Sequence, residues 1–307
     1  MPSGAQGSAD TEDALAEKPI SWYRAIQEDN QEAAKKAIQI ELSELIEKHG
    51  LKNYLILFLY DDVDSISDYH SDQLYAAASA AENGKRDILL VLHSSGGSIE
   101  PAYLISKTLK RLSAKKFVVA VPRRAKSAAT LISLGADEIH MGMTSQLGPI
   151  DPQMGGLPVL ALQNALECIA EVACRYPASS EMFTKYLVDQ VPIRILGHLK
   201  RVGESAVQYA ERLLAGKKVG DNKTPEQVAN HLVNYYKDHG FVIDSDEAKK
   251  LLGSAIVKEG TAEYAVSNEI FQLFDLIGWC YKRKNRSFWY VGALDGGHGT
   301  REIKTNS

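Results

Sequence analysis

The stretch that decides the fold is "DILLVLHSSGGSIEPAYLISKTLKRLS", residues 87–113. An apolar run of strand length leads into a turn with paired glycines, and the residues after the turn follow helical spacing. Paired glycines allow positive φ angles and a close approach of the backbone to a ligand. Their N–H groups, near a helix start, can point at an anion or at the oxyanion of an attacked carbonyl. A tight strand-to-helix turn without a ligand is the other interpretation, and this motif alone leaves both open.

Apolar runs of the same kind recur on both sides of this stretch. They lie at 54–60, 116–122 and 138–142, and helical segments separate them. Apolar strands separated by helices predict an α/β fold with a mostly parallel sheet covered on both faces. In such a sheet the loops that leave the carboxyl ends of the strands gather functional groups. We therefore expect three loops to converge. They are 61–72, 93–98 and 123–127.

The remaining segments read as helical additions to one α/β core. The expected boundaries are a disordered tail at 1–18, an N-terminal helix at 19–50, the α/β core at 51–175, a helical part of the core that covers the cleft at 176–255, a C-terminal helix at 256–290 and a flexible tail at 291–307. The first segment is small, polar and acidic, which is the opposite of a signal peptide.

The composition excludes several classes of protein. With 45% hydrophobic and 24% charged residues and a formal net charge of −4, the chain is an ordinary globular protein without the concentrated basic face of a nucleic-acid binder. No run approaches the ~18 apolar residues that span a bilayer. Cys168, Cys174 and Cys280 form neither a disulfide framework nor a metal motif. We expect buried thiols at the first two positions, a cytoplasmic location, and no metal or other cofactor.

A second motif, "RRAKSAATLISLGADEIHM" at 123–141, places Ser127 where an apolar strand turns into a helix. A serine at this point can cap the helix, or it can be a nucleophile at the positive end of the helix dipole. A nucleophilic serine also needs a group that takes its proton. The glycine-pair turn after the preceding strand could supply an oxyanion hole beside it, and this pairing of loops favours the nucleophile.

Three segments carry a family resemblance: "LHSSGGSIEPAYLI", "AKSAATLISLGADEIHMG" and "SQLGPIDPQ". They resemble the Clp-protease/crotonase superfamily of serine proteases, and within it the signal-peptide-peptidase-like branch called serine dehydrogenase proteinases (SDH_sah). The resemblance is specific over roughly residues 50–155 and weaker from 175 to 255, where "HGFVIDSDEAKKLLG" is also similar to the family. It implies a spiral of βαβ units that assembles into homo-oligomers and acts on peptide or protein substrates.

The resemblance also implies site residues. Ser127 matches the nucleophile, Gly96 and Gly97 match the glycine pair whose amides form the oxyanion hole, and Ala128 follows the nucleophile and can add a further N–H. Asp151 lies in the segment that lines the cleft, near the position where Clp proteases place a histidine.

The chain departs from the family pattern at two further positions. The family usually has proline where this chain has Ser95, and glycine where it has Ala129. His140 is the histidine nearest to Ser127 in the following sequence, and we expect it to be a packed residue of the sheet.

The signal-peptide-peptidase branch uses lysine as the base, since desolvation can lower the pKa of a lysine toward neutrality. Lys185, flanked by apolar residues, is the favoured candidate, and Lys200 is the second. Lys126, next to the serine, has the wrong geometry for a dyad. The leading hypothesis is therefore a serine peptidase with Ser127 and Lys185. The alternatives are an inactive scaffold that binds partners on the same fold and a crotonase-like acyl-CoA enzyme with Asp151 as the base.

Overall fold

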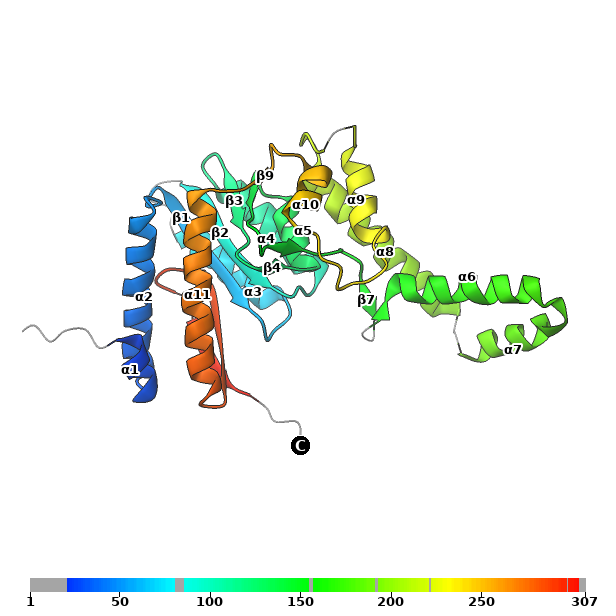
Figure 1. Cartoon of the computed structure of the whole chain (residues 1–307), viewed down its shortest axis with the longest axis horizontal. Helices are drawn as coiled ribbons and strands as arrows, with labels where there is room; N and C mark the ends of the chain where they lie inside the picture. Colours follow the sequence, from blue (N-terminus) through cyan, green and yellow to red (C-terminus); the bar gives the residue numbers. More distant parts are fainter. Residues whose placement is uncertain are drawn as a thin grey trace, which may run out of the picture.

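The computed structural model describes residues 21–80, 86–154, 157–190, 193–220, 222–296 and 298–303, so the predicted tail at 1–18 lies outside the described residues. An α/β body carries two long helices along one side, and a pair of helices extends from the opposite side (Figure 1). No helix in these ranges combines the length and the apolar character that crossing a bilayer requires.

The body is built on one sheet that is mostly parallel, which confirms the predicted fold class. Its parallel strands, in spatial order, are β1 (Tyr54–Asp61), β2 (Asp87–Ser94), β3 (Phe117–Ala120), β5 (Glu138–His140) and β9 (Val257–Lys258). Two antiparallel strands, β10 (Arg286–Ala293) and β11 (His298–Glu302), extend the sheet beyond β1. The apolar runs of the sequence predict the first four parallel strands because those strands are buried on both faces.

Each face of the sheet has its own hydrophobic core. Side chains alternate along β1, so that Leu57 packs on one face and Phe58 on the other. The helices on the first face include α3 (Asp68–Ala80), α4 (Ile99–Leu112) and α5 (Ala128–Leu134), and those on the second are α1 (Trp22–Gln27), α2 (Gln31–Lys48) and α11 (Ala262–Lys282). Figure 1 shows α2 and α11 side by side over the second face.

The C-terminal part differs from the sequence-based expectation. The helix α11 ends at Lys282, and the residues that were expected to finish the helix and form a flexible tail instead build β10 and β11. The reason is pairing. The strand β10 carries three consecutive aromatic residues, Phe288, Trp289 and Tyr290, among small and charged ones, and it lies antiparallel to β1, which would otherwise be an open edge of the sheet.

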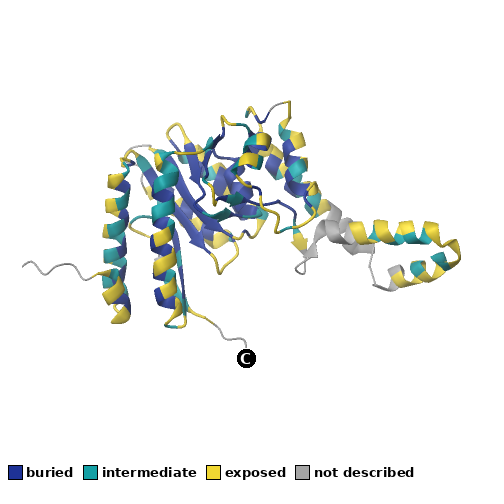
Figure 2. Ribbon diagram, in the orientation of Figure 1, coloured by how far each residue is buried: buried dark blue, intermediate teal, exposed yellow. Residues whose placement is uncertain are grey.

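The second half contributes helices around the body and beyond it. They are α6 (Val159–Arg175), a short 3-10 turn (Pro177–Ser179), α7 (Ser180–Gln190), α8 (Ile193–Leu214), α9 (Pro225–Asn234) and α10 (Ser245–Leu252). We call α6, the 3-10 turn and α7 the helical arm; none of its residues from 164 to 186 is buried (Figure 2). Cys168 and Cys174 lie on the arm and are exposed, so the prediction of buried thiols at these positions is wrong.

Candidate active site

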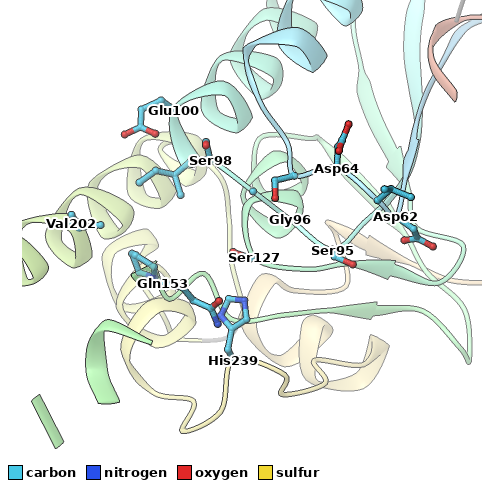
Figure 3. Close-up of a pocket in the computed structure, with 15 residues that line it drawn as sticks. Asp62, Asp64, Ser95, Gly96, Ser98, Glu100, Ser127, Gln153, Val202 and His239 are labelled. Carbon is cyan, nitrogen blue, oxygen red and sulfur yellow. The ribbon is translucent and has the colours of Figure 1, made fainter. Parts of the chain in front are cut away.

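A pocket of about 460 Å³ opens at the carboxyl ends of β1 and β2 (Figure 3). The three loops that were expected to converge all contribute to it. Its walls come from residues 62–65, 95–100, Ser127, Pro152, Gln153, Val202 of α8 and His239. Asp151, one residue before this wall, is buried.

A short ladder of backbone pairs brings these segments into register. Ser94 at the end of β2 pairs with Ala125 of β4 (Arg124–Ala125), which pairs with Leu147 of β6 (Gln146–Leu147). Leu147 pairs in turn with Ile243, through two hydrogen bonds of 2.8 and 3.1 Å. Ser94 precedes the glycine turn, Ala125 precedes Ser127, Leu147 precedes Asp151, and Ile243 follows His239. The ladder therefore delivers four chemically active segments to one pocket.

Ser127 has a strained backbone. Its φ of 50° and ψ of −117° are unusual for a residue with a side chain, and such conformations cost about 1–3 kcal/mol and concentrate at active sites. Its hydroxyl makes no capping hydrogen bond to α5, although Ser127 is the N-cap residue of that helix. The helix-cap interpretation therefore fails. A strained serine between a strand and a helix, exposed to a pocket, is the arrangement of a nucleophile elbow.

Sterics explain both glycines before the nucleophile. Gly96 has a φ of 109°, and a Cβ added to it would lie 2.8 Å from the Cβ of Ser127. A Cβ on Gly97 would lie 2.2 Å from the backbone nitrogen of Ile66. Ile66 donates to the Gly96 carbonyl at 2.9 Å, so the glycine turn is pinned to the loop after β1. Only glycine lets the turn pass this close to both neighbours.

The amides near Ser127 divide into two kinds. The Gly96 N–H donates to the hydroxyl of Ser94 at 3.1 Å. In the part of the chain that the structure describes, the N–H groups of Gly97 and Ala128 have no hydrogen-bond acceptor. Gly97 and Ala128 therefore offer the two donors that an oxyanion would need, and Gly96 has a steric role.

Ala129 fits the turn without crowding. Its N–H donates to the Lys126 carbonyl at 2.8 Å, and its methyl group is fully buried in the core. Ser95 lines the pocket with an exposed side chain. Neither departure from the family pattern distorts the turn.

His239, which was not predicted from the sequence as a site residue, also lines the pocket. His239 lies in the loop of residues 235–244 between α9 and α10, which we call the His239 loop. Its Nδ1 is 2.6 Å from Oδ1 of Asp151, whose side chain is only 4% exposed. A carboxylate accepts the Nδ1 proton and thereby leaves Nε2 as a proton acceptor. Figure 3 shows the imidazole on the wall of the pocket that Ser127 shares.

His239 escaped notice because it follows Ser127 by more than a hundred residues, whereas a base was expected soon after the nucleophile. One signal was available. The family-like segment "HGFVIDSDEAKKLLG" begins with this histidine, and it lies in a loop rather than on a helix face.

The structure does not bring the predicted lysine to the pocket. Lys185 lies on α7 of the helical arm, 75% exposed, with its amine 3.0 Å from Glu181 one turn earlier on the same helix. The helix α7 contacts α6 and the 3-10 turn, and Figure 1 shows the arm extending away from the body. Lys185 therefore cannot take the proton of Ser127 within the chain, which corrects the assignment. The side chain of Lys200 lies outside the described residues.

The acidic loop after β1 forms the opposite wall of the pocket. Asp61 is buried and accepts the N–H groups of Val63 and Asp64, each at 2.8 Å. Asp62 lies 3.0 Å from Nε2 of His93 and 2.8 Å from Nη2 of Arg124. Burial would raise the pKa of Asp62, but these two partners outweigh it and hold the pKa below its ordinary value.

Hydrogen bonds and ion pairs thus hold the acidic loop in place as a wall of the pocket. Across the described ranges, no group of three or more histidine, cysteine, aspartate or glutamate side chains is arranged to hold a metal ion.

Comparison with known proteins places the chain in a family. The sequence profile of the ClpP-like SDH-type serine proteinases matches residues 53–277, and the chain belongs to this family. The match includes Ser127, Asp151 and His239. By its family and its α/β fold, the chain is a ClpP-like member of the SDH-type serine proteinases.

The individual relatives cover less of the chain. Two uncharacterized proteins of Methanocaldococcus jannaschii are 40% identical over 97 residues and 38% identical over 76 residues. These matches span 33% and 26% of the length of those relatives, and 32% and 25% of this chain.

Solved structures of the 1510-N membrane-bound stomatin-specific protease were also found, in two mutant forms. One, in complex with a substrate peptide, has a TM-score of 0.43 at 15% identity and covers 83% of this chain and 90% of its own. The other has a TM-score of 0.42 at 16% identity and covers 82% of this chain and 93% of its own.

Proposed function

We propose that the protein hydrolyses peptide bonds through an acyl-enzyme on Ser127, with His239 as the general base and Asp151 as the residue that orients it. One observation carries this proposal: the imidazole of His239 is held by a buried carboxylate at 2.6 Å and shares a pocket with a strained serine. A base oriented by a third group beside a nucleophile is the general signature of covalent catalysis by serine.

The reaction would proceed in two halves. Nε2 of His239 takes the hydroxyl proton while Oγ of Ser127 attacks the peptide carbonyl, and the proton then passes to the leaving amine as the C–N bond breaks. Water, activated by the same imidazole, hydrolyses the ester and releases the second product. The Asp151 carboxylate, held against Nδ1 of His239, would stabilise the imidazolium that forms in each half.

The oxyanion of each tetrahedral intermediate would rest on the amides of Gly97 and Ala128. Both are backbone donors fixed by the glycine turn and by the start of α5, so they need little reorganisation when the charge develops. Gly96 is left out of this pair because its own amide already donates to Ser94.

The two alternatives lose support. The scaffold hypothesis was motivated by the missing histidine together with Ser95 and Ala129. Because His239 lines the pocket and Ala129 is accommodated in the turn, that motivation is weaker. The acyl-CoA hypothesis required Asp151 as a free base, but this carboxylate is buried and held by His239.

The decisive experiment compares the purified wild type with Ser127→Ala and His239→Ala on a fluorogenic peptide library and with a fluorophosphonate probe. We expect both variants to lose on the order of 10³-fold or more in kcat/KM while keeping the wild-type circular dichroism. The probe should label Ser127 in the wild type and react far more slowly with His239→Ala. Undiminished cleavage by folded Ser127→Ala would refute the proposal.

We also propose that the active form is a homo-oligomer and that its substrates are peptides or proteins in the cytoplasm. Self-association is supported by the helical arm, where large apolar side chains face solvent. Tyr176, Met182 and Tyr186 are 58%, 60% and 61% exposed. The cytoplasm remains a prediction from the absence of a disulfide framework in the sequence.

A further inference from the structure

Lys126, the residue before the nucleophile, reaches the loop that carries the base. Its Nζ donates to the carbonyl oxygen of Phe241 at 2.8 Å and lies 3.4 Å from that of Gly240. Gly240 directly follows His239. One side chain thus joins the backbone of the nucleophile turn to the backbone of the His239 loop.

The path of this side chain is kept open by a glycine. A Cβ on Gly148 would lie 2.6 Å from Cδ of Lys126. Gly148 is itself fixed, since its N–H and its carbonyl oxygen both pair with the hydroxyl of Thr130, each at 2.9 Å. It belongs to the segment that leads to Asp151. The side chain of Lys126 therefore passes over Gly148, in the segment that leads to Asp151, and reaches the His239 loop.

The surroundings of the Lys126 amine act on its pKa in opposite directions. Burial lowers the pKa of Lys126, Arg124 lowers it further, and Asp238 in the His239 loop opposes both. Hydrogen bonds from a charged amine to carbonyls are stronger than those between neutral groups. A lysine is suited to this task because its long stem spans the gap and its head group can donate to two carbonyls at once.

We propose that Lys126 is a positioning residue, which holds the His239 loop at a fixed place relative to Ser127. This inference rests on the proposed function. The ladder pair Leu147–Ile243 fixes the end of the loop that leads into α10, and Lys126 fixes the loop beside the imidazole itself. Because its amine is aimed at backbone carbonyls, Lys126 is not the proton acceptor of a serine–lysine dyad.

The test compares Lys126→Met, Lys126→Arg and the matched control Lys217→Met. Lys217 is also a partly buried lysine that donates to two backbone carbonyls, those of Leu134 and Ala136, but these lie at the other end of α5. We expect Lys126→Met to lower kcat on the order of 10- to 100-fold with KM nearly unchanged, since a base displaced by about 1 Å loses this much. Lys126→Arg should recover most of the loss, and Lys217→Met should keep the wild-type kcat.

A pH profile separates positioning from general destabilisation. In the wild type, kcat should fall at alkaline pH as Lys126 loses its proton, and in Lys126→Arg, whose guanidinium does not titrate there, this fall should be absent. If Lys126→Met does not fold, the inference is tested by comparing the pH dependence of kcat for Lys126→Arg with that of the wild type.

Two outcomes would overturn the inference: wild-type kcat in folded Lys126→Met, or identical alkaline limbs for the wild type and Lys126→Arg. Failure of the proposed function looks different, because Ser127→Ala or His239→Ala would then retain activity.

Discussion

At the residue scale, the candidate site combines side chains that lie far apart in the sequence, among them Asp151 and His239. Asp151 was expected to act as a weak base, and in the structure it is instead the partner of a histidine. A buried carboxylate with one imidazole against it orients that imidazole, because the carboxylate fixes which ring nitrogen carries the proton. In the proposed mechanism Asp151 therefore acts indirectly, through His239.

The first prediction concerns this carboxylate. Asp151→Asn should keep the size of the side chain but favour the wrong tautomer of His239, so kcat should fall on the order of 10³- to 10⁴-fold with little change in KM. Steady-state kinetics on a fluorogenic peptide measures this, with exposed Asp246→Asn on α10 as the control. A loss below about tenfold in folded Asp151→Asn would contradict the assigned role.

Residues also show why the site was only partly predictable. Ser127 and Gly97 could be assigned because they follow strands whose apolar runs are continuous, so their loops must meet at one edge of the sheet. His239 lies in an irregular loop that the pair Leu147–Ile243 brings into place, and no local pattern encodes that pairing. Lys185 has apolar neighbours in sequence, but its own side chain is 75% exposed on the helical arm.

At the scale of elements, the same contrast holds. The strands β1 and β2 could be predicted because burial on both faces requires an uninterrupted apolar run. The strand β10 was missed because it follows a long helix and carries mixed residues, and its place is fixed by β1. Long-range pairing decides such strands, and intrinsic β-propensity is only a weak guide to them.

The second prediction concerns Lys217, which follows α8 and donates to the carbonyl oxygens of Leu134 and Ala136 at the end of α5. Burial lowers the pKa of Lys217 from 10.5 to about 8. Below pH 8 the folded state holds a charge that burial penalises. Between pH 8 and 10.5 the unfolded state binds a proton that the folded state lacks, so this group adds stability as the pH rises.

The free energy of unfolding of the wild type should therefore increase relative to that of Lys217→Met from pH 8 to pH 10. Urea unfolding at several pH values measures the difference between the two proteins. A difference that stays constant across this range, or shrinks, would show that the buried amine does not titrate there.

At the scale of the whole molecule, the helical arm stands out because its apolar side chains are not buried within the chain. None of its residues from 164 to 186 is buried, although α6 and α7 carry many apolar side chains. Isolated helices that expose apolar faces gain stability by covering them, and a second copy of the chain offers an identical surface for this purpose. The proposed self-association accounts for an arm that has no core of its own.

The third prediction tests this surface. The double variant Met182→Glu/Tyr186→Glu should lower the molar mass measured by light scattering, because charges would be buried in the contact, while the unfolding midpoint of the body should change little. Lys185→Ala, on the same helix, is the control and should keep both the mass and the peptidase activity. A wild type that is monomeric at every concentration would contradict the proposal.

The ladder that joins Ser94, Ala125, Leu147 and Ile243 has a consequence for the protein during its synthesis. A ribosome completes the strained serine and its glycine turn more than a hundred residues before it adds the imidazole. Until the segment around Ile243 emerges and docks, the nascent chain would hold the serine of the proposed mechanism without its proton acceptor. In that mechanism, hydrolysis therefore requires that this late segment has been synthesised and has docked.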